Sequence, residues 1–340
     1  MMKRILPVLV TATLAFAITL AIGYVIDNKL PGFEKSYTFF VYPQESLDSV
    51  ADSIKANAGV KRPASLERAL EKENVSVALK PGKYTISPSN PSIYVARMLS
   101  RGWQTPVSVT LSGSLRTKGK IARQLGNQLL IDSATVYNAL NDNDFLSQYG
   151  FDSQSAFSLF LPDTYEMYWT VSLEDLFGRF KKEYDAFWTD ERLAKAAEIG
   201  LTPKEVSVLA SIVTAETLKK SEYSRIAGVY MNRLSIGMCL QADPTVSFCY
   251  DYKLERVLTK HLSVDSPYNT YMHPGLPPGP ICASSKECLD AVLNYERHDY
   301  YYFCASAAFD GTHKFAENLS QHLRNAGEFQ SELSRRQKRK

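Results

Sequence analysis

Glu216 is the residue of this chain whose type and position first suggest chemistry. It ends an apolar run, residues 206–215, whose hydrophobic side chains recur at helical spacing on more than one face, so this helix is predicted to be buried nearly all round. Thr202, Pro203 and Glu205 predict where the helix begins, as N-cap, first helical residue and capping-box partner. Burial raises the pKa of a carboxyl group, and a carboxyl group that stays protonated near neutral pH can act as a general acid.

The alternative interpretation of Glu216 is a structural ion pair. Arg225 and Arg233 belong to the next predicted core helix, residues 225–234, and either could be the partner. A carboxylate paired in this way would stay ionised and would serve the fold. The helix pattern alone leaves both interpretations open.

Other site chemistries find less support in the sequence. Ser112 and Ser114 have no G-x-S-x-G motif around them, so a serine nucleophile is disfavoured. Neither C-x-x-C nor H-E-x-x-H spacing occurs and no nucleotide-binding loop is found, so we expect no metal and no cofactor. Asp163 and Tyr165 lie in a polar turn after an apolar run, where a chain can aim side chains into a cleft. A plain turn at the end of a strand is the alternative there.

Length and composition describe a globular protein. The chain has 340 residues, enough for two domains, with 45% hydrophobic and 22% charged residues. The net charge is only +3, and residues 335–340 contribute to it. This basic end is expected to be a solvated terminus, with binding to anionic glycan or lipid as the alternative, and no nucleic-acid partner is expected.

The uncharged run from Ile5 to Ile26 is 22 residues long, which is enough to cross a bilayer as a helix. Lys3 and Arg4 precede it and favour a cytoplasmic N-terminus. A cleaved signal peptide is the competing interpretation, since residues 15–17 read Ala-Phe-Ala. The apolar run continues well past that point, so we expect an uncleaved single-pass anchor with the rest of the chain on the outer side of the membrane.

Five cysteines all lie in the last third of the chain. Their close spacing outside the membrane predicts a disulfide, with Cys282–Cys288 as the favoured pair and Cys239–Cys249 as a second. The alternative is a set of buried thiols that pack as small hydrophobic residues.

The first soluble part, residues 36–104, predicts a small α+β module. Its pattern reads strand, helix, helix, strand, helix, at residues 37–42, 46–54, 65–74, 80–86 and 92–99. The module resembles the LysM-like glycan-binding unit of cell-wall enzymes. Residues 27–35 before it are polar and contain Pro31 and Gly32, so they are predicted to form a linker.

The rest of the chain carries a series of motifs in a fixed order. They are Phe160–Tyr165, Ala210–Val213 with Glu216, Val229 with Asn232–Leu234, Ile236–Met238, Leu240–Gln241, Asp243–Val246, Tyr268–Tyr271, Gly275–Gly279, and His313, Phe315 and His322. On these motifs, residues 106–330 resemble the YceG-like family of membrane-bound endolytic murein transglycosylases. The resemblance implies an α+β chain with residues 1–4 in the cytoplasm, a transmembrane helix at 5–26, the linker at 27–35 and the LysM-like module at 36–104. A larger mixed α/β catalytic domain at 105–330 and a basic tail at 331–340 follow.

The resemblance also implies roles for individual residues. Glu216 matches the catalytic acid/base of the family. The residues implied to bind or orient the substrate are Asp243, Tyr268, Asn269, Asp163, Tyr165, Asn232, Gln241 and His313. Two positions depart from the family pattern: Thr214 stands where an acidic residue is usual, and Ser112-Gly113 stands where Glu-Gly is usual. The cysteines are not part of that pattern.

The implied reaction is the non-hydrolytic cleavage of the β-1,4 bond between MurNAc and GlcNAc in nascent peptidoglycan, which leaves 1,6-anhydro-MurNAc ends and terminates glycan elongation. The implied partners are peptidoglycan strands and the inner membrane, and cell-wall synthases are candidate partners. A hydrolytic muramidase with Asp243 or Asp163 as its second carboxylate is the enzymatic alternative. A non-catalytic glycan-binding scaffold is the alternative from another class of protein.

Overall fold

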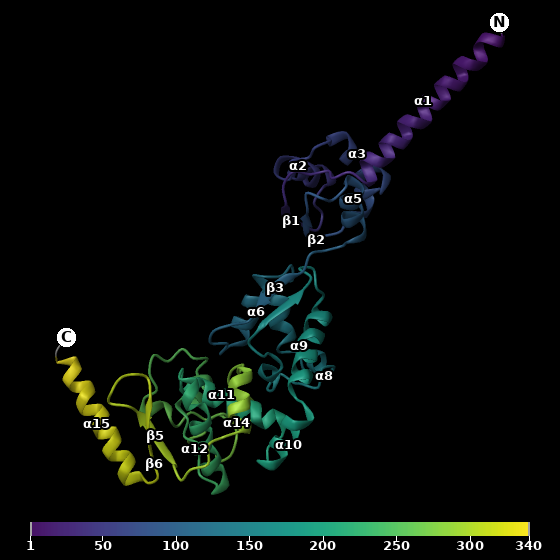
Figure 1. The fold of residues 1–340 in the computed structure, drawn as a ribbon. Helices are drawn as coiled ribbons and strands as arrows, with labels where there is room; N and C mark the ends of the chain where they lie inside the picture. The colour runs from purple at the N-terminus through teal and green to yellow at the C-terminus, as the bar shows by residue number, and fades with distance from the viewer. Residues whose placement is uncertain (1, 339–340) are drawn as a thin grey trace. The chain divides into compact units, whose positions relative to one another are not determined.

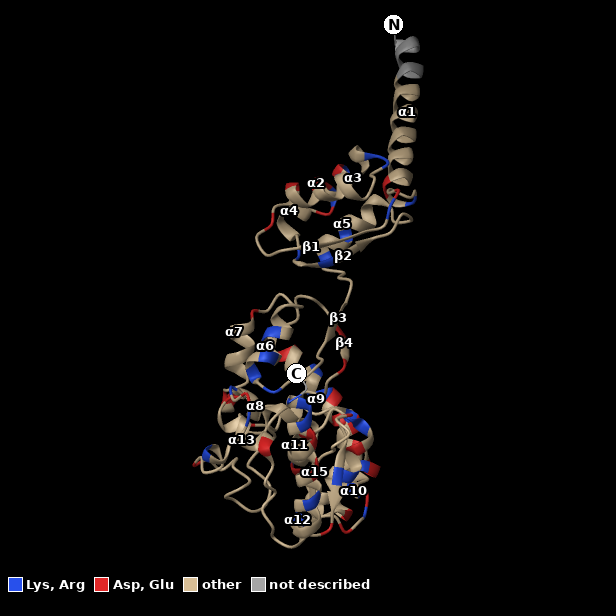
Figure 2. Cartoon of the chain, turned by 90° about the vertical axis from the view of Figure 1, so that its left-hand side faces the viewer, with Lys and Arg blue, Asp and Glu red and all other residues tan. Residues whose placement is uncertain are grey.

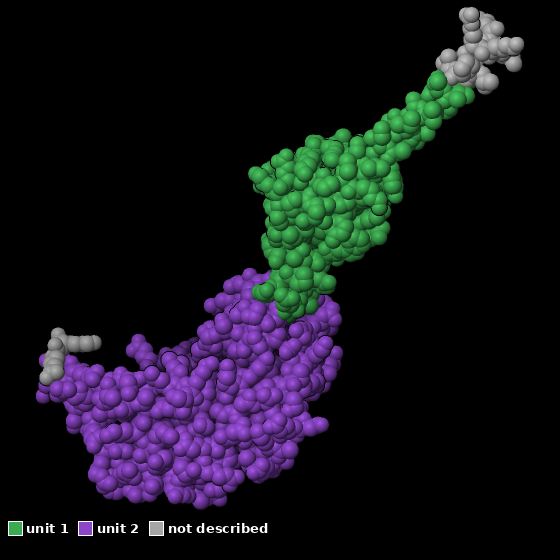
Figure 3. Space-filling view, viewed as in Figure 1, with its two compact units in different colours: residues 1–108, 166–171 green, residues 109–165, 172–340 purple. Residues whose placement is uncertain are grey.

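The computed structural model describes residues 2–338, and the side chains of its N-terminal helix are described from Leu9 onward. The chain divides into two compact units, residues 1–108 with 166–171 and residues 109–165 with 172–340 (Figure 3). The chain passes from one unit to the other within the strands β3 (Val107–Thr110) and β4 (Thr164–Met167), which form a two-stranded sheet.

The N-terminal helix α1 (Met2–Asn28) is apolar over Leu9–Asn28, with a mean hydropathy of 2.2. In Figure 2 the cartoon of α1 below its grey first turns is tan, the colour of uncharged residues, and in the sequence Asp27 is the first charged residue of this part. It is long and apolar enough to cross a membrane, a property that anchors and signal sequences share. The predicted cytoplasmic residues 1–4, including the Lys3 and Arg4 side chains, lie outside the described side chains.

The first unit has the predicted order of elements. β1 (Tyr37–Val41) pairs antiparallel with β2 (Gly82–Ile86), with Tyr37 opposite Ile86. Between and after them lie α2 (Leu47–Asn57), α3 (Pro63–Lys72), the short α4 (Val75–Ala78) and α5 (Ser92–Arg101). The apolar faces of these elements meet in one core around the fully buried Ile54, Leu66 and Tyr84. The helix and strand periods read from the sequence are therefore confirmed here.

The predicted linker 27–35 differs from the structure. Asp27 still belongs to α1 and its carboxylate accepts hydrogen bonds from Arg68 and Ser65 at 2.7 and 2.6 Å. Phe33 is fully buried and bridges to Val60. This segment therefore belongs to the first unit. Although most of its residues are polar, the burial of Phe33 and the hydrogen bonds of the Asp27 carboxylate hold it in place.

The second unit is mostly helical, and the prediction of a mixed α/β domain is corrected in this respect. Its helices are α6 (Lys118–Gly126), α7 (Ser133–Ala139), α8 (Asn143–Ser147), α9 (Leu173–Phe187), α10 (Asp190–Glu198), α11 (Pro203–Glu216), α12 (Tyr223–Ser235), α13 (Asp243–Cys249), α14 (Lys286–Leu293) and α15 (Leu319–Gln337). Its remaining sheet is the antiparallel pair β5 (Tyr302–Ala305) and β6 (His313–Ala316). Strands of four residues bury too little surface to form a layer, so helices supply the core.

Helix α11 lies at the centre of the second unit and contacts α10, α12, α13 and α14 (Figure 1). Its residues Val206–Val213 are all buried, as the hydrophobic side chains on more than one face of this helix predict. α15 lies against β5 and β6 (Figure 1). It continues through residue 331, where a separate basic tail was predicted. Within it, Arg335 and Arg336 both pair with Glu332, at 2.6 and 2.8 Å, in i,i+3 and i,i+4 contacts that a helix brings together.

Candidate active site

Helix α11 places Glu216 at its last position. The predicted capping box is present: the Thr202 hydroxyl accepts from the Glu205 amide, and the Glu205 carboxylate accepts from the Thr202 amide at 2.8 Å. The helix ends at Glu216 because Thr217 is extended, with φ −141° and ψ 146°. The negative end of the helix dipole therefore lies beside the Glu216 carboxylate, which disfavours its ionised form.

The surroundings of Glu216 fit a carboxyl group that exchanges a proton near neutral pH. Burial raises the pKa of Glu216 to about 7, and the negative charge of Asp243 acts in the same direction. The hydroxyl of Tyr230, a buried residue of α12, donates a hydrogen bond to Glu216 Oε1 at 2.7 Å and opposes this rise, as does the charge of Arg233. The Glu216 side chain is only partly buried, since one side faces a cavity.

A structural ion pair for Glu216 finds no support. The buried Arg233 guanidinium donates to two backbone carbonyls, those of Tyr301 at 2.7 Å and Leu240 at 2.6 Å. Arg225 pairs with Glu296 at 3.0 Å. Among the ion pairs of residues 2–338, none joins Glu216 to an arginine, and Arg233 acts on it through charge alone.

The cavity in front of Glu216 has a volume of about 260 Å³ and mostly polar walls. It is lined by Glu216, Tyr230, Arg233, Leu240, Gln241, Asp243, Tyr271, Phe303, Cys304, Ala305 and His313. Three of the predicted substrate-binding residues, Gln241, Asp243 and His313, are thus brought together with Glu216. Polar side chains around one titrating carboxyl group can hold a polar ligand in a defined orientation.

Asp243 is positioned by a residue that the sequence analysis did not single out. The Tyr271 hydroxyl donates to Asp243 Oδ1 at 2.6 Å. Asn269 is fully buried and fixes the loop before Tyr271, because its amide donates to the carbonyls of Leu262 and Val264 and its oxygen accepts from the Tyr271 amide. Asn269 therefore acts on the cavity through Tyr271 and does not line it.

His313 is held by the buried carboxylate of Glu222. His313 Nδ1 lies 2.8 Å from Glu222 Oε2, and the His313 amide donates to Glu222 Oε1 at 2.8 Å. Two contacts to one buried side chain fix both the backbone and the ring of His313 at the cavity wall. The ring of Phe303 stands edge-on against His313, with centroids 5.4 Å apart.

The other predicted site residues do not line this cavity. Asp163 pairs with Lys286 at 2.7 Å, and the buried Tyr165 donates to the Leu161 carbonyl. The Asn232 amide donates to the carbonyls of His298 and Tyr300, and the Tyr268 ring packs on Phe248 with centroids 4.6 Å apart. These four residues hold turns and loops of the second unit.

Tyr230 and Glu222 are functional candidates that the sequence analysis did not name, and it considered Arg233 only as an ion-pair partner and Tyr271 only as the end of a motif. Tyr230 and Arg233 are three residues apart in a predicted core helix, so both fall on one face among apolar neighbours. A polar pair on an apolar helix face is a signal that could have found them. Nothing local distinguishes Tyr271 or Glu222, whose partners are distant in the sequence.

The predicted Cys282–Cys288 disulfide is wrong, because all five cysteines are free thiols in the structure. The Cys282 and Cys288 thiols donate to the carbonyls of Ser211 and Ala210 in α11, each at 3.3 Å. Burial raises the pKa of both thiols to about 12. They pack behind the helix that carries Glu216, as the alternative interpretation of buried small residues expects.

The chain belongs to the YceG-like family, because the model of that family matches residues 39–328. It is similar to the endolytic murein transglycosylase of Bacillus subtilis, at 34% identity over 152 residues, which cover 45% of this chain and 41% of that protein. It is also similar to the endolytic murein transglycosylase of Streptococcus pneumoniae strain D39, at 26% identity over 90% of this chain and 61% of that protein. The chain thus spans between about two fifths and three fifths of these relatives' length.

A solved structure has the same fold. The yceG-like protein from Listeria monocytogenes superposes with a TM-score of 0.57 at 24% identity, over 85% of this chain and 98% of that one. At this identity the likeness concerns the fold alone.

Proposed function

We propose that this chain is an endolytic lytic transglycosylase that cleaves the β-1,4 bond between MurNAc and GlcNAc within nascent peptidoglycan strands. One observation carries the proposal: a single carboxyl group, Glu216, has a pKa of about 7 and faces a polar cavity. Curated relatives in the same family bear the name endolytic murein transglycosylase, which supports the choice of substrate.

In this reaction Glu216 acts twice. It first donates its proton to the glycosidic oxygen while the bond from C1 of MurNAc to that oxygen breaks. The resulting carboxylate then takes the proton of the C6 hydroxyl of MurNAc, whose oxygen bonds to C1 and closes the 1,6-anhydro ring. The attack is intramolecular and gains from effective molarity, so no second carboxylate is needed to activate water. Glu216 ends the cycle protonated, as it began.

The other cavity residues have supporting roles in this proposal. The negative charge of Asp243, oriented by Tyr271, stabilises the positive charge that develops at C1. Gln241 and His313 are placed to hydrogen-bond the sugar hydroxyl and acetamido groups. Glu222 positions His313 for that contact.

A hydrolytic muramidase is the second candidate, because Asp243 supplies another carboxylate in the same cavity. A hydrolase needs two carboxyl groups about 5–5.5 Å apart for retention or about 6.5–9.5 Å apart for inversion. Asp163 is weaker in this role, since Lys286 neutralises it and it does not line the cavity.

Mass spectrometry of the products separates the candidates. The full chain in detergent is incubated with murein sacculi, and the ends of the released glycans are weighed. A transglycosylase gives 1,6-anhydro-MurNAc ends that are lighter by one water than hydrolysed ends. Reducing ends throughout would identify a muramidase and direct attention to Asp243. A glycan-binding scaffold would pellet with the sacculi and release nothing soluble.

We also propose a place for the protein. α1 anchors it in the inner membrane with both units on the outer side, the first unit acts as a LysM-like glycan-binding module, and cleavage next to cell-wall synthases terminates glycan elongation. The apolar Leu9–Asn28 segment supports the anchor.

The anchor is expected to be retained in the mature protein. The apolar helix continues well beyond the Ala15–Ala17 segment where a signal peptidase would cut, and Asp27 near its end is paired with Arg68. N-terminal sequencing of membrane-extracted protein should therefore begin at residue 1 or 2. A sequence starting near residue 18 would identify a cleaved signal instead.

Tyr230→Phe is expected to move the alkaline limb of the pH–rate profile upward by about one pH unit. The Tyr230 hydroxyl stabilises the ionised form of Glu216, so its removal raises the pKa of Glu216 and keeps the acid protonated to higher pH. The measurement is kcat/KM for sacculus digestion between pH 5 and 9. Tyr184→Phe, which changes a buried tyrosine of α9 outside the cavity, should leave the limb in place. If the alkaline limb of the Tyr230→Phe variant stays in place or moves to lower pH, the hydrogen bond from Tyr230 to Glu216 does not have the effect assigned to it.

A further inference from the structure

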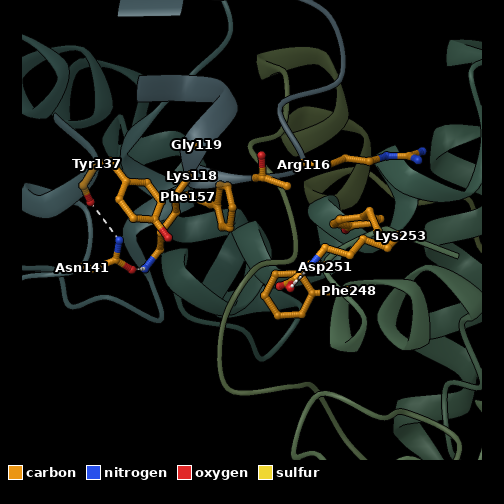
Figure 4. Close-up of a pocket in the computed structure, with 11 residues that line it drawn as sticks. Arg116, Lys118, Gly119, Tyr137, Asn141, Phe157, Phe248, Asp251 and Lys253 are labelled. Atoms are coloured by element: carbon orange, nitrogen blue, oxygen red, sulfur yellow. Dashed lines mark hydrogen bonds and ion pairs between the residues drawn. The ribbon is translucent and has the colours of Figure 1, made fainter. Parts of the chain in front are cut away.

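The second unit contains a larger cavity that the proposed reaction leaves unused. Its volume is about 490 Å³, within the range of ligand sites. Its walls come from the start of α6, from α7, from the turn Ala156–Leu159 and from the end of α13 with the loop that follows (Figure 4). Its lining includes three cationic and three aromatic side chains, those of Arg116, Lys118, Lys253, Tyr137, Phe157 and Phe248.

The charge of this cavity is positive. Lys253 has its own counterion, since its ammonium lies 3.0 Å from the Asp251 carboxylate. Arg116 and Lys118 have none among the ion pairs of residues 2–338. The Arg116 guanidinium lies over the Tyr252 ring, 5.3 Å from its centroid, and the Lys118 ammonium donates to Asn141 Oδ1 at 2.9 Å. The two cations are thus held in place without being neutralised.

Lys118 is half-buried, and burial lowers its pKa. The nearby carboxylate of Asp152 favours the charged form of Lys118 through space, and its Oδ1 accepts hydrogen bonds from the amides of Gln154 and Ser155. A half-buried cation without an ion-pair partner gains when an anion enters the cavity beside it.

Aromatic rings complete the walls. Phe157 is buried, Tyr137 is exposed at the rim, and Phe248 is fixed by its contact with Tyr268. In Figure 4 the Tyr137, Lys118 and Asn141 side chains lie on one side of the cavity and those of Arg116 and Lys253 on the other. Aromatic faces accept the apolar faces of sugars and of small side chains, while fixed cations accept carboxylates.

Helix α13 joins this cavity to the candidate active site. Its first residue, Asp243, lines the Glu216 cavity, and Phe248 lines the larger one. The two positions are separated by about 7–8 Å along the helix axis. The two cavities are therefore lined by opposite ends of the same short helix, Asp243–Cys249.

We propose that this cavity binds the peptide stem that branches from the glycan strand, with Arg116 and Lys118 holding its carboxylates. The inference rests on the proposed function. Arg116 offers a planar fork that matches a carboxylate with two hydrogen bonds, and Lys118 adds a point charge deeper in the cavity. The lactyl carboxylate of MurNAc without a stem has the same chemistry, and the experiment separates the two sources.

The binding test uses the full chain in detergent with Glu216→Gln, so that no substrate is consumed. Calorimetry is run with three probes: a disaccharide–tetrapeptide, the same disaccharide without peptide, and the free tetrapeptide. Adding Arg116→Met and Lys118→Met should weaken the disaccharide–tetrapeptide by at least about tenfold, the effect of losing one charge-assisted hydrogen bond. Lys120→Met is the matched control, because Lys120 is exposed on the same helix and does not line the cavity.

Each outcome decides the proposal. Unchanged affinity of the double variant for the disaccharide–tetrapeptide would overturn it. An equal loss for the disaccharide without peptide would assign the site to the lactyl carboxylate and overturn the stem. The thermal unfolding midpoint of each variant is compared with that of the parent, and equal midpoints exclude a loss of binding through misfolding. We expect equal midpoints because Arg116 is exposed and its change to Met keeps the aliphatic stem.

A turnover experiment tests the stem-binding cavity separately from the proposed function. With Glu216 intact, the ratio of kcat/KM for strands with stems to kcat/KM for amidase-stripped strands should fall about tenfold in the double variant. A wild-type chain that releases nothing from either strand would contradict the proposed function, and the binding result alone would then decide the stem site. An unchanged ratio in an active enzyme would overturn the stem site and leave the proposed function standing.

Discussion

Glu216→Gln is expected to lower the rate of glycan cleavage by at least about 10²–10⁴-fold, the usual effect of losing a general acid or base. The larger value is expected because one group serves both proton transfers in the proposed reaction. Gln keeps the shape of the side chain and can still accept the hydrogen bond of Tyr230, but it can neither give nor take the proton. Sacculus binding should remain nearly unchanged. The measurement is the release of soluble fragments from sacculi at pH 6 to 7.

The matched control is Glu198→Gln, which neutralises an exposed carboxylate of α10 whose pairing with Arg297 is long, at 3.7 Å. This variant should cleave like the wild type. Full activity of Glu216→Gln would remove Glu216 from the mechanism altogether. Equal loss in both variants would indicate an effect of net charge on substrate binding.

The second large effect is on stability: Glu216→Gln should stabilise the fold above pH 7. The pKa of Glu216 is about 7 in the folded protein and near 4.5 in the unfolded chain, so the folded state holds the proton more tightly. Below pH 4.5 both states are protonated and Glu216 carries no penalty. Between pH 4.5 and 7 the unfolded state ionises first, so the free energy of unfolding falls as pH rises. Above pH 7 the penalty is constant at no more than about 3 kcal/mol.

Gln has no charge to lose, so it escapes this penalty. The difference in unfolding free energy between Glu216→Gln and the wild type should therefore grow between pH 4.5 and 7 and stay level above pH 7. Denaturant titrations at pH 4.5, 6 and 8 measure it, with Glu198→Gln expected to show no such growth. A difference independent of pH would mean that Glu216 has an ordinary pKa, and the case for a general acid would weaken.

The candidate acid was accessible from the sequence because its determinants are local. Thr202 and Glu205 form a capping box around Pro203 within one turn, and the hydrophobic side chains that follow on more than one face bury the helix. Glu216 continues the apolar face of this helix, so helical spacing predicts that it points toward the core, where burial is the main cause of its raised pKa. The helices and strands of the first unit could be predicted for the same reason, because each shows the hydrophobic periodicity of its own type of secondary structure.

The limits of local patterns appear in three places. Phe33 and Asp27 fix the predicted linker through contacts with Val60 and Arg68, which no window around residue 30 contains. The close spacing of Cys282 and Cys288 suggested a disulfide, but both thiols turn toward carbonyls of α11. The second unit is mostly helical because its strands are short. The resemblance predicted a mixed α/β domain and gave no strand lengths.

What surrounds Glu216 was decided by the tertiary structure. Tyr230 comes from the next helix, Tyr271 reaches Asp243 from 28 residues away, and Glu222 holds His313 across 91 residues. Tyr268 and Asn269 precede Tyr271 in the same motif, yet their side chains turn to other partners. A helix period fixes where a side chain lies on its own helix, because the hydrogen bonds that set it span four residues. The direction of a loop side chain depends on which distant groups can satisfy its polar atoms, and only the packed chain brings those groups together.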